Sequence, residues 1–196
     1  MRYWFAFLVL AICVNPVSAQ PPDPKTDFAH DVAEVLKETG LPPHLLCLEL
    51  TESLLADHAE GRVRSVLTAL KSLGVTLALD DFGTGYSSLG YLTQLPFDTI
   101  KIDRIFVDGI ANSESARKLL EGIIALGRGL GMTIVAEGAE TAEEVAILGE
   151  FRCDLVQGYI FARPLAAKDA LKSAWTLEGK GLLVDGSPAA TSAAAA

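Results

Sequence analysis

The chain has 196 residues, of which 50% are hydrophobic and 21% are charged, and its formal net charge is −9. These values suit one folded domain and exclude an intrinsically disordered chain. Sixteen basic against 25 acidic residues argue against binding to a nucleic-acid backbone, so we expect neither DNA nor RNA as a partner. Three cysteines are too few for a disulfide scaffold.

The two ends of the chain differ from its middle. Arg2 precedes an apolar run over residues 3–14, a break at Asn15-Pro16 and small residues at 17–19, a pattern typical of a secretory leader. The run is shorter than the roughly 20 residues that cross a bilayer, so no stable membrane span is expected. The sequence therefore predicts a leader over 1–19, a linker over 20–25, a folded region over 26–177 and a disordered tail over 178–196.

The middle of the chain alternates between helical and strand patterns. Its first helix is expected over 27–39, with Phe28, Val32, Val35 and Leu36 on one side and Gly40 as its stop. The elements expected next are strand 46–50, helix 57–73, strand 75–81, helix 86–95, strand 99–103, a helix from Ser113 to Gly131, strand 133–137, a helix opened by a capping box of Thr141 and Glu144, and strand 155–161. This alternation predicts an α/β fold with a parallel sheet covered by helices.

Each predicted strand carries a polar side chain at or near its carboxyl end. These residues are Glu49, Asp80, Lys101, Glu137 and Gln157. In a closed (β/α)8 barrel they would converge at the rim where active sites lie. A doubly wound open sheet, the competing architecture, would gather ligands with fewer strands. Taken singly, each residue is more often a helix cap, a solvated charge or an ion-pair partner. Together, five such groups are costly to bury unless they pair or bind metal, which favours a functional site.

The residue types indicate metal-assisted chemistry. Glu49, Asp80 and Asp81 offer hard oxygen ligands for Mg²⁺ or Mn²⁺. Lys101 could hold an attacking water or offset charge on a phosphate, and Glu137 could bind metal and accept a proton from that water. The three histidines fit no metal-ligand spacing and are expected at the surface. Cys47 and Cys153 are expected to be isolated buried thiols.

Five motifs carry a resemblance to a known family. They are Leu48-Glu49-Leu50-Thr51-Glu52-Ser53, Asp80-Asp81-Phe82-Gly83-Thr84-Gly85-Tyr86-Ser87-Ser88-Leu89, Lys101-Ile102-Asp103, Ala136-Glu137-Gly138-Ala139-Glu140 and Gln157-Gly158-Tyr159. Over residues 28–167 the chain resembles the EAL-domain family of bacterial phosphodiesterases, which hydrolyse cyclic di-GMP to linear pGpG. The resemblance implies a partial (β/α)8 barrel of the TIM type, formed by about the last five βα units and lacking the first strands.

The resemblance also implies roles for individual residues. Glu49, Asp80, Asp81 and Glu137 match metal ligands, for two ions in a complete family member, and Glu137 also matches a residue assigned as general base. Lys101 matches the lysine that positions the catalytic water, and Glu52 matches the residue that orders the loop after Asp81. That loop links metal binding to a homodimer. Glu140 and Gln157 match other active-site positions.

Two segments of the family pattern are absent from the printed sequence. One is the Glu-Ala-Leu strand with its nearby arginine, and the other is an Asn-Leu-Ser segment; both supply metal ligands in the family. We therefore expect this polypeptide alone to lack activity. The alternatives are a non-catalytic EAL-like module that binds nucleotide or a protein partner, and a fragment without function. The family acts in the cytoplasm, whereas the leader predicts export to the periplasm.

Overall fold

The computed structural model describes residues 28–52, 60–84, 89–165 and 169. The chain divides into a first unit up to Lys101 with residues 130–132, and a second unit of residues 102–129 and those from Thr133 onward. The strands of the sheet follow one another in chain order, β1-β2-β3-β4-β5. Pairs β1–β2 and β4–β5 are parallel. The expected α/β fold with a parallel sheet is confirmed. The predicted leader, linker and tail lie outside the described residues.

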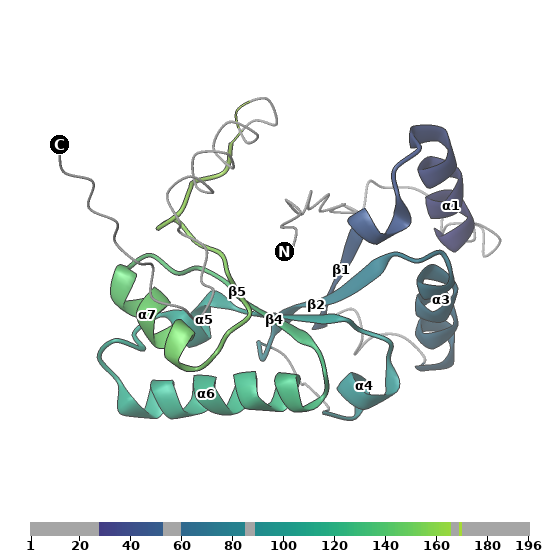
Figure 1. Ribbon diagram of the computed structural model, residues 1–196. Helices are drawn as coiled ribbons and strands as arrows, with labels where there is room; N and C mark the ends of the chain where they lie inside the picture. The colour runs from purple at the N-terminus through teal and green to yellow at the C-terminus, as the bar shows by residue number, and fades with distance from the viewer. Residues whose placement is uncertain (1–27, 53–59, 85–88, 166–168, 170–196) are drawn as a thin grey trace, which may run out of the picture. The chain divides into compact units, whose positions relative to one another are not determined.

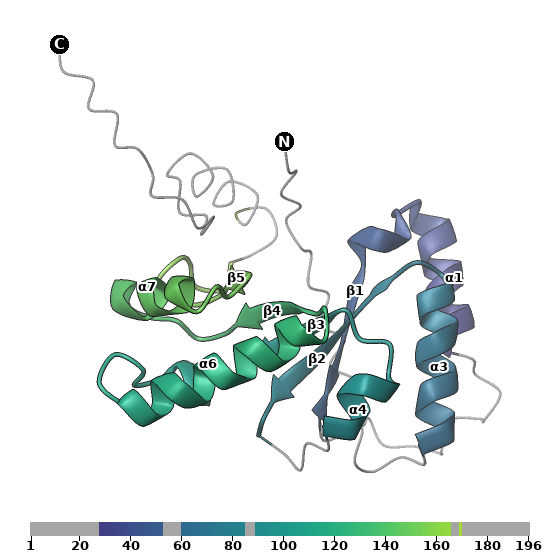
Figure 2. The ribbon, with the colours of Figure 1, turned by 60° about the horizontal axis from the view of Figure 1, so that its bottom comes forward.

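The first unit alternates helices with the first strands of the sheet. In β1–β2 the register places Glu49 opposite Ala78 and Thr51 opposite Asp80. Helices α1 and α3 lie side by side (Figures 1 and 2). Its elements are α1 (Phe28–Thr39), the 3₁₀ turn η1 (Pro43–Leu45), β1 (Cys47–Thr51), α3 (Glu60–Ser72), β2 (Thr76–Phe82), α4 (Leu89–Gln94) and β3 (Thr99–Ile102), whose last residue belongs to the second unit.

The second unit continues the alternation. Helix α6 packs against β4 (Figure 2), and the short α5 packs against α6. Helix α7 begins with the predicted capping box, in which the Thr141 and Glu144 side chains bind each other's backbone amides. The elements are α5 (Arg104–Val107), α6 (Glu114–Gly129), β4 (Thr133–Ala136), α7 (Ala142–Glu150) and β5 (Leu155–Val156).

Branched aliphatic side chains form the cores of both units. The first unit buries Leu67, Leu70, Val75, Leu77 and Ile100, and the second unit buries Ile102, Ile110, Leu120, Ile124, Ile134 and Leu148, each at most 1% exposed. Burial of a side chain of this size contributes about 1.5–3 kcal/mol to folding. These side chains support the strands on which the predicted site residues lie.

The predicted buried side of α1 is partly wrong. Val32 and Leu36 are buried as expected, but Phe28 and Val35 are 43% and 54% exposed. Ala29 joins the buried stripe instead, so the helix packs through positions spaced by three and four residues. Gly40 does end α1, with φ +68° and its amide bonded to the carbonyl of Leu36.

Two other predictions need correction in the second unit. The last strand was expected over 155–161, but β5 covers only Leu155–Val156 because the chain turns after Gln157. A helix over 104–107 was not expected. Helix α5 forms there because the side chain of Asp103 caps it, accepting a hydrogen bond from the amide of Ile105.

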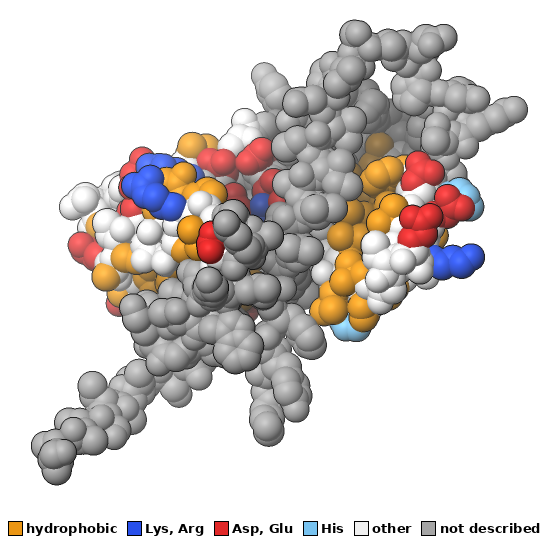
Figure 3. Space-filling view, turned by 90° about the horizontal axis from the view of Figure 1, so that it is seen from above, with side chains coloured by type: hydrophobic (Ala, Val, Ile, Leu, Met, Phe, Trp, Pro, Cys, Tyr) orange, Lys and Arg blue, Asp and Glu red, His pale blue; other side chains and the backbone are white. Residues whose placement is uncertain are grey.

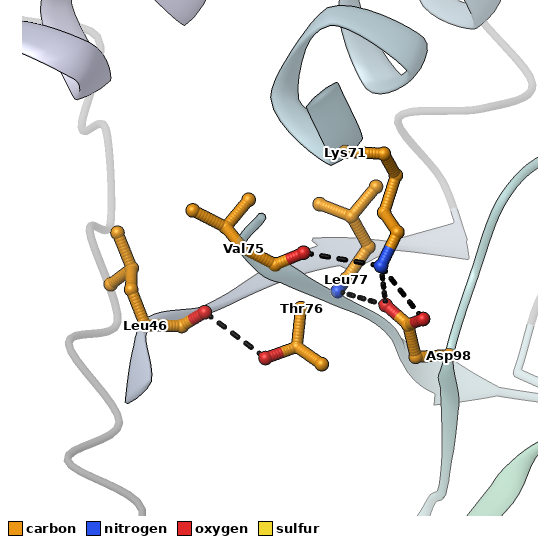
Figure 4. A network of polar contacts seen from close by, with 6 residues as sticks. All are labelled: Leu46, Lys71, Val75, Thr76, Leu77 and Asp98. Atoms are coloured by element: carbon orange, nitrogen blue, oxygen red, sulfur yellow. Dashed lines mark hydrogen bonds and ion pairs between the residues drawn. The ribbon is translucent and has the colours of Figure 1, made fainter. Parts of the chain in front are cut away.

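A lysine–aspartate clamp ties α3 to the start of β2 in the first unit (Figure 4). Lys71 Nζ donates to both carboxylate oxygens of Asp98 at 2.8 Å and to the carbonyl of Val75 at 3.2 Å. Asp98 in turn accepts the amide of Leu77 at 2.8 Å. The clamp therefore fixes the segment before β3 against β2. Asp98 lies three residues before Lys101, and Leu77 lies three residues before Asp80.

The second unit contains a matching clamp. Arg128 binds Asp154 at 3.5 Å, and Asp154 accepts the amide of Ile134 at 2.9 Å. Residues 71–80 and 128–137 share the pattern of a basic residue, one variable residue and then Leu-Gly-x-Thr, and both segments end on an acidic residue. Asp154 precedes Gln157 by three residues, as Asp98 precedes Lys101. The repeat thus aligns Asp80 with Glu137 and Lys101 with Gln157, a relationship that our sequence analysis did not find.

We expect Asp98→Ala to lower the free energy of unfolding by about 1–2 kcal/mol, because it leaves the Leu77 amide without its acceptor and Lys71 without its counterion. Urea unfolding followed by circular dichroism measures this change. The control is Asp108→Ala at an exposed aspartate, expected to change stability by less than about 0.5 kcal/mol. Equal midpoints for the two variants would show that the clamp contributes nothing.

Candidate active site

Lys101 on β3 joins two carboxylates of the first unit, Glu49 on β1 and Asp80 on β2. Its Nζ lies 2.9 Å from Glu49 Oε2 and 2.8 Å from Asp80 Oδ1. The three side chains are only 10%, 12% and 20% exposed, so water screens the charges weakly. Three of the five predicted strand-end residues are thereby brought into direct contact.

The charge of this cluster favours a further cation. One ammonium faces two carboxylates, which leaves a formal charge of −1 among the three side chains. Carboxylate oxygens are the ligands that Mg²⁺ and Mn²⁺ prefer, and Mg²⁺ commonly uses one or two carboxylates with water in its remaining positions. Within the described ranges, no group of three or more His, Cys, Asp or Glu side chains is close enough to hold a metal. The donor set fits an ion whose coordination is completed by water or substrate.

Asp81 occupies a strained position beside this cluster. Its φ is +54°, in the left-handed region that a non-glycine residue enters at a cost of about 1–3 kcal/mol. Thr84 closes the turn, because its amide and hydroxyl both donate to the carbonyl of Asp81, at 3.2 and 2.9 Å. Backbone strain of this kind clusters at functional sites, so it supports a functional role for the Asp80-Asp81 pair.

Glu52 contacts the turn that follows Asp81. It is 5% exposed, and its Oε2 accepts the amide of Gly83 at 2.9 Å. Gly83 has φ +95°, a conformation suited to glycine. In the described part of the chain, Glu52 Oε1 has no hydrogen-bond partner. The predicted loop-ordering residue thus binds the beginning of the expected loop, whose residues 85–88 lie outside the described ranges.

Glu137, Glu140 and Gln157 lie together in the second unit. The amide of Glu137 donates to the carbonyl of Ile102 at 3.0 Å, which extends the strand pairing beyond β4. Backbone hydrogen bonds join Gln157 to Ala136 at 2.8 Å and to Ala139 at 3.1 Å. Glu137 is half-buried, whereas Glu140 and Gln157 are exposed. A common pocket for all five strand-end residues stays a prediction.

Comparisons with known proteins assign this arrangement to a family. The family model described as "EAL domain" matches residues 6–164. The chain belongs to the EAL domain family. The match begins inside the segment predicted as a leader, which lies outside the described residues.

Similar proteins show what other members bind. The cyclic di-GMP phosphodiesterase NbdA of Pseudomonas aeruginosa is 43% identical over 141 residues, which are 72% of this chain and 18% of that protein. The EAL domain of Mycobacterium smegmatis DcpA is 37% identical with a TM-score of 0.73, covering 79% of this chain and 68% of that one. The manganese and cyclic di-GMP complex of Klebsiella pneumoniae BlrP1 is also 37% identical, with a TM-score of 0.66, covering 71% of this chain and 35% of that one. The chain spans about a fifth of the length of the curated relatives it matches.

Two of the three histidines of this EAL domain lie at the surface in the described part of the chain. His30 is exposed on α1, where it pairs with Glu34 at 3.6 Å, and His44 is exposed in the η1 turn. Acidic and histidine side chains gather with apolar ones at the right of Figure 3, the side on which Figure 1 draws α1. The surface prediction is therefore confirmed for these two, while His58 lies outside the described residues. Among the described residues, no helix is long and apolar enough to cross a membrane.

Cys47 and Cys153 of the EAL domain are buried free thiols, as predicted. Burial raises the pKa of each thiol from 9.0 to about 11; the charge of Glu49 adds to the rise at Cys47, and backbone hydrogen bonds oppose it at Cys153. Neither thiol has the low pKa of a nucleophilic cysteine.

The raised thiol pKa values predict a loss of stability at high pH. The fold favours the neutral thiol, so the stabilisation is complete below about pH 9, the ordinary pKa, and is lost as the pH rises through about 11. We expect Cys153→Ala to flatten part of the fall in unfolding free energy between these values, measured by urea unfolding at several pH values. A pH dependence identical to that of the unaltered chain would contradict the expectation.

Arg104 contacts Glu140, one of the predicted site residues, and the sequence patterns did not predict this contact. It follows the Lys101-Ile102-Asp103 motif and binds Glu140 across 36 positions of sequence, with Arg104 Nη1 and Glu140 Oε1 3.0 Å apart. Spacing and periodicity report only local neighbours, so they gave no signal for it. A signal did exist for the relation of Glu137 to Asp80, namely the repeat of residues 71–80 at 128–137.

Proposed function

We propose that this EAL domain binds cyclic di-GMP with divalent ions and carries residues that hydrolyse one of its phosphodiester bonds to give linear pGpG. The observation that carries the proposal is the bridge from Lys101 to Glu49 and Asp80 at 2.9 and 2.8 Å, which joins three consecutive strands of the sheet. The names of NbdA and of the BlrP1 complex support this substrate. We also propose that the domain acts in the cytoplasm, whereas the predicted leader would direct its export to the periplasm.

Metal ligands in this proposal are Glu49, Asp80, Asp81 and Glu137. Two adjacent aspartates can serve two ions, and all four residues offer the oxygen atoms that Mg²⁺ and Mn²⁺ prefer. When bound, the ions would lower the pKa of a water and offset the charge of the reacting phosphoryl group. The bridging position of Lys101 supports cation binding here, since its ammonium already draws two of these carboxylates to one point.

The remaining chemistry falls to protein side chains. Lys101 Nζ would donate a hydrogen bond to the attacking water, and a carboxylate oxygen of Glu137 would take the water's proton. The water oxygen would form a bond to phosphorus as the bond from phosphorus to the ribose 3′ oxygen breaks, that oxygen would take a proton from solvent water, and Glu137 would return its proton to solvent. Gln157 and Glu140 would line the substrate site. Glu52 would hold the loop after Asp81, through which we propose that two copies of the chain pair.

A second candidate function is a module that binds nucleotide without hydrolysing it. The printed sequence contains neither the Glu-Ala-Leu nor the Asn-Leu-Ser segment, which supply metal ligands in the family. Loss of supporting groups at a metal site already costs about 10–100-fold in metal affinity or activity. We therefore expect turnover by this chain alone to be low or absent even where cyclic di-GMP binds.

The proposal is tested by incubating the purified chain with cyclic di-GMP and Mn²⁺, and separately Mg²⁺, and separating pGpG by chromatography. Calorimetry under the same conditions measures binding. The variants are Lys101→Ala and Glu49→Gln, with Lys118→Ala and Glu114→Gln as matched controls, because that exposed pair lies on the outside of α6. Both site variants are expected to lose at least about tenfold in binding or turnover, and both controls to keep them.

The outcomes separate the candidates. Metal-dependent pGpG that disappears in Lys101→Ala supports the phosphodiesterase. Metal-dependent binding without pGpG supports the non-catalytic module. If cyclic di-GMP does not bind with either metal, or binds equally to site and control variants, both candidates fail.

A further inference from the structure

The segment from Glu137 to Thr141 is held at almost every residue. The amide of Ala139 donates to the carbonyl of Gln157 at 3.1 Å. The amides of Glu140 and Thr141 both donate to Glu144 Oε2, at 2.9 and 3.0 Å. These bonds restrain the backbone at Ala139, Glu140 and Thr141, and they leave Gly138 and the direction of the Glu140 side chain to other contacts.

Arg104 supplies that contact and a second one. Its guanidinium Nη1 lies 3.0 Å from Glu140 Oε1. Its aliphatic stem lies against Gly138, where a Cβ atom built on the backbone would stand 2.5 Å from Arg104 Cγ and 2.9 Å from Cδ. Gly138 also has φ +77°, which glycine adopts without strain. The side chain therefore extends over Gly138 and ends on Glu140.

The anchor of Arg104 is itself well defined. Arg104 is the first residue of α5, directly after the capping residue Asp103. The guanidinium and the carboxylate are 54% and 44% exposed, so this pair contributes little to folding stability. Its contribution is geometric, because a planar guanidinium restricts the carboxylate that it binds.

We propose that Arg104 is a positioning residue, which holds segment 137–140 and sets the direction of Glu140 toward a bound nucleotide or its metal ions. The inference rests on the proposed function, since it assigns Arg104 to the same site. Arg104 acts through Glu140 and Gly138. Substitution of Arg104 should therefore alter ligand binding much more than it alters unfolding.

The first measurement needs no ligand. Backbone amide exchange, followed by NMR, compares the unaltered chain with Arg104→Ala and Arg104→Lys, with Arg64→Ala on the exposed side of α3 as the control. Arg104→Ala is expected to speed exchange at Ala139 and Glu140 by about threefold to tenfold, while Arg64→Ala changes neither. Unchanged exchange in Arg104→Ala would overturn the proposal.

The second measurement is a double-mutant cycle on cyclic di-GMP affinity in the presence of Mn²⁺. Arg104→Ala and Glu140→Gln are each expected to weaken binding about tenfold, and the double variant is expected to be no weaker than the worse single variant. Arg104→Lys, which keeps the charge and the aliphatic stem but loses the planar guanidinium, should recover part of the loss. Urea midpoints of all variants should match that of Arg64→Ala.

The two proposals fail in different ways. Additive losses in the cycle, or a loss that follows the unfolding midpoint, would overturn the positioning role of Arg104. Absence of cyclic di-GMP binding by the unaltered chain would overturn the proposed function, and the amide exchange would then decide by itself whether Arg104 fixes the segment.

Discussion

Lys101→Met is expected to lower the free energy of unfolding by about 3 kcal/mol in the absence of divalent ions, because removal of one partner leaves buried charges uncompensated. The variant would leave Glu49 and Asp80 facing each other at side-chain exposures of 12% and 20%. Urea unfolding in the presence of a chelator measures the effect. Lys118→Met, at a lysine side chain that is 72% exposed, is the matched control and should change stability by less than about 0.5 kcal/mol.

Divalent ions should reverse part of this loss. If Mn²⁺ binds the two carboxylates that Lys101 bridges, it should stabilise Lys101→Met by about 2.7 kcal/mol at one hundred times its dissociation constant. Combining Lys101→Met with Glu49→Gln and Asp80→Asn should also restore stability in chelator, because no charge then stays unpaired, but should abolish the response to Mn²⁺. A Lys101→Met variant as stable as Lys118→Met would contradict the account of the cluster.

Gly158→Ala is the second substitution with a large expected effect. A Cβ atom at Gly158 would overlap the backbone nitrogen and carbonyl oxygen of Ala139 and would lie 2.6 Å from its carbonyl carbon. Ala139 is fully buried and its amide and carbonyl are both hydrogen-bonded, so it has little room to move. We expect a loss of about 3 kcal/mol, at the upper end of the usual cost of overpacking.

The matched control is Gly122→Ala inside α6, where an added Cβ atom meets nothing within 4 Å. That substitution should stabilise the protein by about 0.5–1 kcal/mol, because alanine favours the helix more than glycine does. Both substitutions add one methyl group, so thermal and urea unfolding should show a lower stability for Gly158→Ala and a higher stability for Gly122→Ala. A Gly158→Ala variant as stable as the unaltered chain would show that the contact with Ala139 relaxes at little cost.

Local patterns predicted much of the fold. The capping box of Thr141 and Glu144 is observed because it depends on residues three positions apart. Phe28 and Val35 were placed on the wrong side of α1, because helical spacing defines an apolar stripe but not which edge of it meets the neighbouring elements. The last strand was predicted too long because Tyr159 to Phe161 continue an apolar run, whereas the close approach of Gly158 to Ala139 turns the chain there.

For the candidate site, too, the sequence allowed the residue types to be predicted but not their contacts. Parallel strands bring their carboxyl ends to one edge, so the residue types at Glu49, Asp80 and Lys101 could be grouped in advance. The bridge that the Lys101 ammonium forms between the two carboxylates could not be predicted, because it depends on strand register and burial. The contact of Arg104 with Glu140 links the start of α5 to the segment after β4, which is far away in sequence, and needs the folded chain.

The most direct test of the account is the position of Mn²⁺ in crystals of this chain grown with cyclic di-GMP, located by anomalous scattering. We expect a manganese peak in contact with oxygen atoms of Glu49 and Asp80, with Lys101 Nζ turned away from at least one of them. Crystals in which manganese binds only elsewhere, or in which Lys101 still bridges both carboxylates while the nucleotide is bound at another surface, would contradict it.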